Sequence, residues 1–278
     1  MQPLVSIGIP VFNAETTLPA TLDSLFQQTF TNYEAIICDN ASQDKTAKIC
    51  QAAVRRRKNV CYLHSPVNHG AFWNFQKALG QAKGKYFMWL AADDMLSKRF
   101  LECNVRPMEK KSSSTVAVAG WNFHPHPLYR KKKIGFACRG HKGQRLSSLL
   151  ENIYDSHAIF YSLMRTNVIR SFPFGNGSFP AWDWAVDTHL AAHGEIERSQ
   201  DAEIIFGRGG LSQQSGGWDL FPGDTLDRKI PTARFSQFML KQLGSVPFLH
   251  RAKIIVKLIK LNQRVWHDLR NSRRYGQG

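Results

Sequence analysis

Short apolar runs alternate with amphipathic stretches over the first 120 residues of the chain. Five of the apolar runs are typical of buried β-strands. They are residues 5–10, 33–38, 60–64, 86–90 and 115–120. Between the runs, apolar residues such as Leu18, Leu22 and Leu25 recur at the three- and four-residue spacing of a helix face. Nearly continuous apolar strands separated by helices predict an α/β fold with a mostly parallel central sheet and helices on both faces.

The pattern is looser in the second half of the chain. Residues 158–164 are again strand-like, and Trp182 opens a helical pattern that ends near Gly194. Residues 125–142 are rich in Pro, His and basic residues and predict an exposed loop. We expect two halves of one domain and a helical C-terminal extension. The three parts are residues 1–120, 121–225 and 226–278.

The C-terminal segment combines an apolar stripe with many positive charges. Between residues 251 and 274, eight Lys or Arg residues accompany a single acid, Asp268. A basic amphipathic helix of this kind suits an anionic membrane surface. It equally suits a helix that packs on its own domain with a solvated basic face, and the sequence favours neither alternative. The stripe comprises Ile254, Leu258, Leu261, Val265 and Leu269.

Composition and charge narrow the class of protein. A chain of 278 residues with 43% hydrophobic residues can build a substantial α/β core. No apolar run approaches the roughly 18 to 20 residues that cross a bilayer, and the first residues do not resemble a secretion signal, so we expect a cytoplasmic protein. Five scattered cysteines without a CxxC pair favour reduced thiols over zinc or disulfides. The net charge of +16 indicates an anionic partner, which charge alone cannot identify.

Polar residues gather where the predicted strands end. Ligands of open α/β sheets bind beyond the carboxyl ends of the strands, so these residues predict a binding site at one edge. Four strand ends contribute to it: Asn13 and Glu15; Asp39 and Asn40; Asn68, Gly70 and Asn74; Asp93 and Asp94.

The adjacent carboxylates Asp93 and Asp94 are the most informative pair. They follow a buried run, and charged groups resist burial unless a cation, hydrogen-bond donors or water compensate them. The alternative is that an Asp simply caps a helix formed by residues 95–100.

Several well-known motifs are absent from the sequence. It contains no GxGxxG after the first strand, no GxxxxGK[ST], no GxSxG and no HExxH. Their absence argues against a dinucleotide-dependent oxidoreductase, a P-loop NTPase, a serine hydrolase and a zinc protease.

The motifs that are present resemble, in order and spacing, those of the family 2 glycosyltransferases. The resemblance is close over residues 4–120 and weaker to about residue 215. It implies a glycosyltransferase-A fold, a nucleotide-sugar donor, a divalent metal (Mn²⁺ or Mg²⁺) and inversion at the anomeric carbon. Residues 1–120 would then bind the donor, and residues 121–225 would bind the acceptor and carry the catalytic group. The matching segments are residues 9–15, 22–30, 39–46, 68–74 and 92–94.

The resemblance implies a role for each strand-end residue. Asp39 would accept the N3–H of uracil, which points to a UDP-linked donor, although Asp39 and Asn40 also fit an ordinary Asx turn. The alternative for Asn68 is a helix cap. The implied base and ribose contacts are Pro10, Phe12, Asn13, Glu15, Asp39, Asn40, Asn68, Gly70, Asn74 and Asp93.

Asp94 is the implied metal ligand. Many family members carry another acid two positions before the first Asp of this pair, and this chain has Ala91 there. We therefore expect the ion to be held largely by the donor's phosphates, which hard cations prefer together with carboxylates.

The catalytic base implied by the resemblance is Asp183, at the start of a helix. Asp187, one turn further on, is the competing candidate. Trp182 and Trp184 flank the base and would stack on the acceptor sugar. Arg208 resembles the basic residue of the family's closing loop, where it would meet the diphosphate, but a surface turn explains it equally well.

We therefore expect an inverting glycosyltransferase that transfers a sugar to a glycan or lipid-linked acceptor in surface polysaccharide assembly, with no nucleic-acid partner. We expect this enzyme to be cytoplasmic and to bind peripherally to the inner face of the membrane through the basic C-terminal helix. One alternative is a sugar-1-phosphate nucleotidyltransferase, which should carry a Gly-rich, Arg-containing loop after the first strand. The other is a non-enzymatic basic protein that binds membrane or nucleic acid, in which acids at a phosphate-binding edge would oppose binding without a metal.

Overall fold

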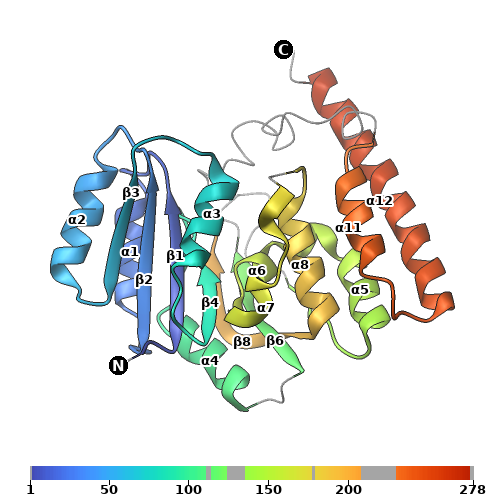
Figure 1. Ribbon diagram of the computed structural model, residues 1–278, viewed down its shortest axis with the longest axis horizontal. Coiled ribbons are helices and arrows are strands. Elements are labelled where there is room, and N and C mark those ends of the chain that lie inside the picture. Colours follow the sequence, from blue (N-terminus) through green and yellow to red (C-terminus); the bar gives the residue numbers. More distant parts are fainter. Residues whose placement is uncertain (1, 111–113, 124–134, 177–178, 208–229, 276–278) are drawn as a thin grey trace.

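The computed structural model describes residues 2–110, 114–123, 135–176, 179–207 and 230–275. These residues contain one eight-stranded sheet with the order β3-β2-β1-β4-β7-β6-β8-β5 (Figure 1). The strands are β1 (Val5–Val11), β2 (Tyr33–Asn40), β3 (Val60–Ser65), β4 (Tyr86–Trp89), β5 (Met95–Leu96), β6 (Thr115–Phe123), β7 (Leu163–Arg165) and β8 (Glu195–Ile205).

The sheet is parallel in the first half of the chain and mixed in the second. β1 pairs in parallel with β2 and β4, and β2 pairs in parallel with β3. β7 then runs antiparallel between β4 and β6, while β6 and β8 are parallel and β5 is an antiparallel edge strand. The α/β fold with helices on both faces is confirmed, and the antiparallel strands are the feature that periodicity did not indicate.

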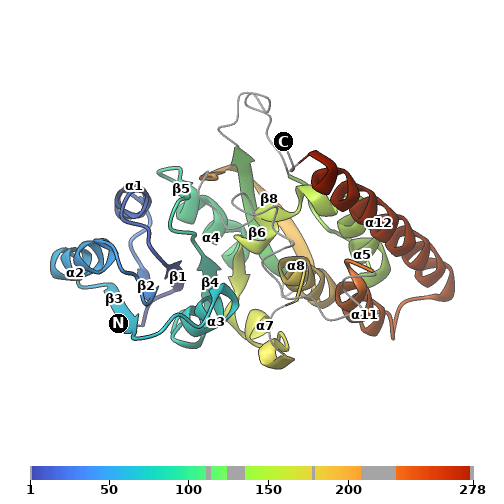
Figure 2. The ribbon, with the colours of Figure 1, turned by 90° about the horizontal axis from the view of Figure 1, so that it is seen from above.

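Helices cover both faces of the sheet; α1 and α3, for example, lie on opposite sides of β1 and β2 (Figure 2). The longer helices are α1 (Leu18–Phe26), α2 (Thr46–Arg56), α3 (Ala71–Gly80), α4 (Phe100–Lys110), α5 (Lys142–Glu151), α8 (Trp182–His193), α11 (Ala233–Lys241) and α12 (Phe248–Tyr275). The shorter ones are α6 (His157–Phe160), α7 (Thr166–Arg170) and two 3₁₀ turns, Ile153–Asp155 and Phe174–Asn176.

The strand expected over residues 158–164 is wrong in its first part. Residues 157–160 form α6, and only Leu163–Arg165 are a strand. Ala158, Ile159 and Phe160 are all buried, and a short, fully buried helical turn has the same apolar run as a strand.

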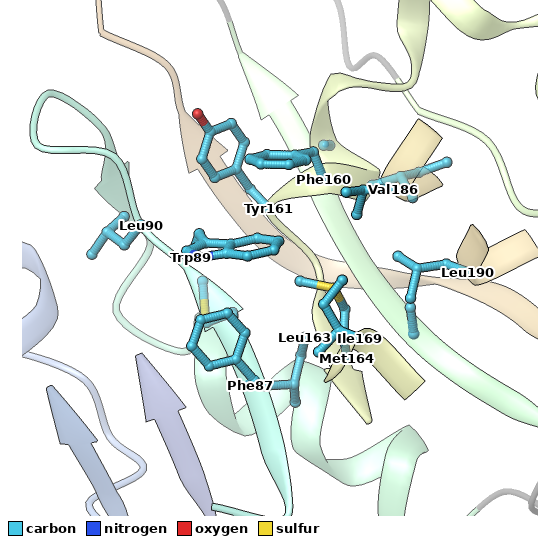
Figure 3. Close-up of a cluster of buried hydrophobic side chains, with 14 of the residues drawn as sticks. Phe87, Trp89, Leu90, Phe160, Tyr161, Leu163, Met164, Ile169, Val186 and Leu190 are labelled. Carbon is cyan, nitrogen blue, oxygen red and sulfur yellow. The ribbon is translucent and has the colours of Figure 1, made fainter. Parts of the chain in front are cut away.

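An aromatic core connects β4 to the helices that follow it. The Trp89 ring of β4 stacks on Phe160 of α6 at 4.8 Å between centroids (Figure 3). Trp182, the first residue of α8, meets Phe72, Phe75 and Phe160 edge-on at 5.1 to 5.6 Å. These contacts fix the start of α8 relative to the end of β4, and both places carry acids of the predicted site.

The C-terminal helix α12 packs on α5 and α11 through the stripe seen in the sequence. Ile254, Leu258, Leu261 and Val265 of this stripe are buried. Packing on the domain is therefore the right alternative for this stripe, and membrane binding through it is wrong. Among the described residues, none of the helices combines the length and apolar character needed to cross a bilayer.

Candidate active site

The loops that follow β1 and β2 are clamped together by hydrogen bonds. The backbone N–H of Asn13 donates to Ser42 Oγ (2.9 Å), and the N–H of Gln43 donates to Asn13 Oδ1 (2.8 Å). The N–H of Lys45 donates to Glu15 Oε2 (2.9 Å). Asn13 and Glu15 thus shape the strand-end edge through their side chains, and their contact with a nucleotide stays a prediction.

Asp39 is buried at the end of β2, and both of its oxygens have protein partners. Oδ1 accepts the N–H of Ser42 (2.9 Å), the bond expected of the turn alternative. Oδ2 accepts the hydroxyl of Tyr62 (2.8 Å), a residue of β3 that sequence reasoning missed. A carboxylate offers about four lone-pair directions, so Asp39 can hold this turn and still accept a donor from a ligand.

Asn40 ties β2 to the loop before α3. Its Nδ2 donates to Asn68 Oδ1 (2.7 Å) and to the carbonyl of Gly70 (3.1 Å), and its Oδ1 accepts the N–H of His69 (3.0 Å). Gly70 is the N-cap residue of α3 and has φ +85°, a conformation that favours glycine. The cap alternative for Asn68 is therefore wrong, because Gly70 occupies that position.

Asn74 joins the ends of two strands. It is buried in α3, and its Nδ2 donates to the carbonyls of Cys38 (2.9 Å) and Val11 (3.3 Å), which joins the ends of β2 and β1. Asn74 therefore positions the two strands, and its contact with a nucleotide stays a prediction.

Pro10 and Phe12 lie at the end of β1. Pro10 is half-buried in the strand, opposite Cys38 of β2. Phe12 follows the strand, and 46% of it is exposed. An exposed aromatic ring beside the Asp39 turn is suited to stacking on a nucleobase.

Asp93 and Asp94 lie in a turn between β4 and β5, and α4 begins only at Phe100. The helix-cap alternative for this pair is therefore wrong. Asp94 is buried: its Oδ1 accepts the N–H of Gly207 (2.9 Å), and its Oδ2 has no hydrogen-bond partner among the described residues. Burial raises the pKa of Asp94 to about 8. The hydrogen bond from the Gly207 N–H lowers this pKa, and the charge of Asp93 raises it further.

The Asp93–Asp94 turn is suited to a divalent cation that is held mainly by the phosphates of a bound nucleotide. The described residues contain no group of three or more His, Cys, Asp or Glu side chains that could bind a metal by themselves. The Asp94 oxygen without a partner, together with the neighbouring Asp93 carboxylate, supplies the hard oxygen ligands that Mg²⁺ and Mn²⁺ accept beside phosphate and water.

Gly207, two residues after β8, was missed by sequence reasoning. A Cβ at this position would collide with the backbone and the carboxylate of Asp93. The absence of a side chain lets β8 approach the acidic turn closely enough for the bond to Asp94. Arg208, the next residue, lies outside the described residues, so its predicted role stays a prediction.

Asp183 and Asp187 share one face of α8 but differ in exposure. Asp183 is half-buried in the first turn, where burial raises its pKa and the N–H groups of Trp184 and of Asp183 itself oppose the increase. Asp187 is buried, its pKa is raised well above the usual range, and neither oxygen has a hydrogen-bond partner among the described residues. Only Asp183 has surface to offer an acceptor hydroxyl, which favours it as the base.

Tyr161, the residue after α6, is buried under the electrostatic influence of three acids of the site. Burial raises the pKa of Tyr161 well above its usual range, and the charges of Asp94, Asp93 and Asp183 add to the increase. Figure 3 shows the hydroxyl pointing away from the aromatic core. The Tyr161 ring also packs against His157 at 5.2 Å. Neither residue stands in a recognisable motif, so no local pattern could have identified them.

The two tryptophans beside Asp183 have different surroundings. Trp182 is only 8% exposed and belongs to the aromatic core, which contradicts its assignment to acceptor binding. Trp184 is half-buried and meets Tyr154 and Phe235 edge-on at 5.5 and 5.7 Å. Acceptor binding by Trp184 stays a prediction.

The fold and the site define an α/β protein whose acids converge at the carboxyl ends of its strands. A sequence model described as "Glycosyl transferase family 2" matches residues 6–169. The chain belongs to this family, and the resemblance found in the sequence is confirmed. Membership argues against both alternatives, the nucleotidyltransferase and the non-enzymatic basic protein.

Each of the curated relatives matches about two fifths of the chain. WfgD of Escherichia coli, a UDP-Glc:alpha-D-GlcNAc-diphosphoundecaprenol beta-1,3-glucosyltransferase, is 34% identical over 112 residues, which are 40% of this chain and 43% of WfgD. The matched segments span about two fifths of the length of the curated relatives.

Solved structures share the fold at low sequence identity. TarS 1–349 of S. aureus in complex with UDP-GlcNAc has a TM-score of 0.67 and 17% identity, covering 93% of this chain and 72% of that chain. The mannosyltransferase PcManGT of Pyrobaculum calidifontis in complex with GDP-Man and Mn²⁺ has a TM-score of 0.56 and 13% identity, covering 100% and 89%. The expected glycosyltransferase-A fold is confirmed.

Proposed function

We propose that this protein is an inverting glycosyltransferase that transfers a sugar from a UDP-linked donor to a glycan or lipid-linked acceptor in cell-surface polysaccharide biosynthesis. The observation that carries the proposal is the buried Asp94 carboxyl beside Asp93, with one oxygen held by Gly207 and the other without a hydrogen-bond partner among the described residues, in a family 2 chain. The names of WfgD and of the TarS complex support a UDP-linked donor, and that of WfgD supports an acceptor on a diphosphate lipid.

The donor would lie across the strand-end edge. Phe12 would stack on the base, and the Asp39 carboxylate would accept its N3–H. Asp94, with Asp93 beside it, would hold Mn²⁺ or Mg²⁺, and the Mn²⁺ complex of PcManGT supports this assignment. When bound, the ion would supply charge neutralisation on the departing nucleoside diphosphate.

Asp183 would act as the general base. The acceptor oxygen attacks the anomeric carbon from the side opposite the diphosphate, its proton passes to the Asp183 carboxylate, and the bond to the diphosphate breaks. One displacement of this kind inverts the anomeric configuration. The raised pKa of Asp183 moves it toward the working pH of a base, and its half-buried position leaves it accessible to the acceptor.

The proposal places this reaction at the cytoplasmic face of a membrane, where a lipid-linked acceptor would be anchored. The strongly basic charge of the chain and the exposed residues of α12 support this location.

Calorimetry with UDP tests the donor and metal assignments together. We expect UDP to bind the wild type tightly only with Mn²⁺, and Asp94→Asn to remove the effect of the metal. Asp23→Asn, which changes an exposed acid of α1, is the matched control and should bind like the wild type. Equal UDP affinity with and without Mn²⁺ in the wild type would exclude the metal assignment.

A further inference from the structure

The helix α12 has a second apolar face that points to solvent. It comprises Phe248, Leu249, Ile255, Val256, Ile259 and Trp266, which we call the outer face. Phe248 is 80% exposed, Leu249 73% and Ile259 53%. At about 100° per residue, the six side chains fall within a sector about 120° wide that excludes the buried stripe.

The exposed apolar side chains of the described residues are concentrated on α12. Six of the thirteen exposed large apolar side chains of the described residues belong to α12, whereas the other seven are distributed over several elements. Scattered apolar residues are normal on a protein surface, but contiguous ones mark a site of interaction with a partner.

A row of positive charges borders the outer face. Lys253, Lys260 and Arg264 are exposed along one edge of it, and Lys253 and Lys260 form no ion pair within the described parts of the chain. Lys257 instead points to α5, where it contacts Glu151 and Ser147. The acid Asp268 is the only one in the helix. The border is therefore complementary to an anionic surface.

We propose that the outer face of α12 binds an anionic lipid bilayer, with the helix lying in the plane of the membrane. Its apolar side chains would enter the boundary between headgroups and acyl chains, and Lys253 and Lys260 would meet the lipid phosphates, whereas Arg264 lies over the Tyr154 ring. This inference deepens the proposed membrane location by naming the partner and the surface, and it does not depend on the donor or the metal. The surface differs from the stripe considered in the sequence, which the fold buries.

Binding of the full-length chain to vesicles tests the apolar part of this surface. We expect the wild type to bind phosphatidylcholine vesicles that contain one third phosphatidylglycerol, and to bind pure phosphatidylcholine weakly. Ile259→Gln should weaken binding roughly tenfold, because it removes about half of an isoleucine side chain from the bilayer. Val54→Gln, at an exposed position of α2, is the matched control and should bind like the wild type.

A second pair of variants tests the charged border. Lys253→Gln/Lys260→Gln should weaken binding to the anionic vesicles about 30-fold, since each lysine near the surface contributes about 1 kcal/mol. Lys48→Gln/Lys58→Gln removes the same charge from exposed positions at and just beyond α2 and should have a much smaller effect. Equal losses in the two double variants would mean that net charge alone drives binding and would overturn the proposal.

Two further outcomes would also overturn it. One is that the wild type binds the anionic vesicles no more strongly than Ile259→Gln does. The other is that the wild type forms a concentration-dependent dimer which Ile259→Gln converts to a monomer. The second outcome would assign the outer face to another copy of the chain. UDP calorimetry on the same samples separates the two proposals. UDP binding without vesicle binding would refute the surface alone, whereas vesicle binding without UDP binding would refute the donor assignment alone.

Discussion

The buried carboxyl of Asp94 should make the stability of the metal-free protein depend on pH. Its pKa is about 8 in the folded protein, against 3.8 for an ordinary Asp. A carboxyl with a raised folded-state pKa binds its proton more tightly when folded, so its stabilising contribution is complete below about pH 4 and is lost as the pH rises through about 8. A difference of about four pH units, at about 1.4 kcal/mol each, sets an upper bound of about 6 kcal/mol on the loss.

Asp94→Asn removes this dependence while preserving the shape of the side chain. The amide oxygen can still accept the N–H of Gly207, but no charge forms at high pH. We expect the variant to become increasingly more stable than the wild type between pH 5 and pH 8, with the gap growing by about 3 to 4 kcal/mol at most. The comparison isolates Asp94, because the two proteins share every other titrating group.

Urea unfolding in EDTA, followed by tryptophan fluorescence at several pH values, measures this gap. Asp23→Asn is the control, and its profile should run parallel to that of the wild type. Adding Mn²⁺ and UDP should stabilise the wild type and leave Asp94→Asn unchanged, because only a bound ligand adds folding free energy. An Asp94→Asn profile parallel to the wild type within about 1 kcal/mol would show that Asp94 ionises freely, and the burial argument would fail.

Three other predictions follow from the site. Asp183→Asn should lower kcat by about 10² to 10⁴ in a nucleotide-release assay with unchanged UDP affinity, while Asp187→Asn stays within a few-fold of the wild type; the reverse order would make Asp187 the base. Gly207→Ala should weaken UDP binding in the presence of Mn²⁺ roughly tenfold, because the added methyl displaces Asp93; unchanged affinity in calorimetry would contradict this. Trp182→Ala should lower the free energy of unfolding by about 3 to 5 kcal/mol. If Trp182→Phe instead raises the acceptor KM without loss of stability, the core assignment is wrong.

The edge that carries the site could be predicted from the sequence. Apolar periodicity located the strands, and parallel strands bring their carboxyl ends to one edge whatever the details of packing. Asp39 lies at the end of β2, Asp93 follows β4, and Asp183 lies in the first turn of α8. These predictions needed only local pattern and topology.

The direction of individual side chains could not be predicted in the same way. Trp182 stands beside Asp183 at the start of α8, but its ring is buried in the aromatic core. Gly207 bonds to an acid 113 residues away, and the charges of Asp93, Asp94 and Asp183, which are far apart in the sequence, all raise the pKa of Tyr161. Contacts over such separations depend on how the elements pack, which no local pattern encodes.

For the helix α12, the sequence pattern predicts the helix and its apolar stripe, and only the structure shows what the stripe contacts. Periodicity correctly identified a helix with an apolar stripe and basic neighbours, but it gave no means of deciding which partner the stripe meets. The structure assigns that stripe to α5 and α11 and leaves the outer face exposed. A helix that only packs on its own domain needs one apolar stripe, so the apolar surface left over after packing is the stronger argument for a partner outside the chain.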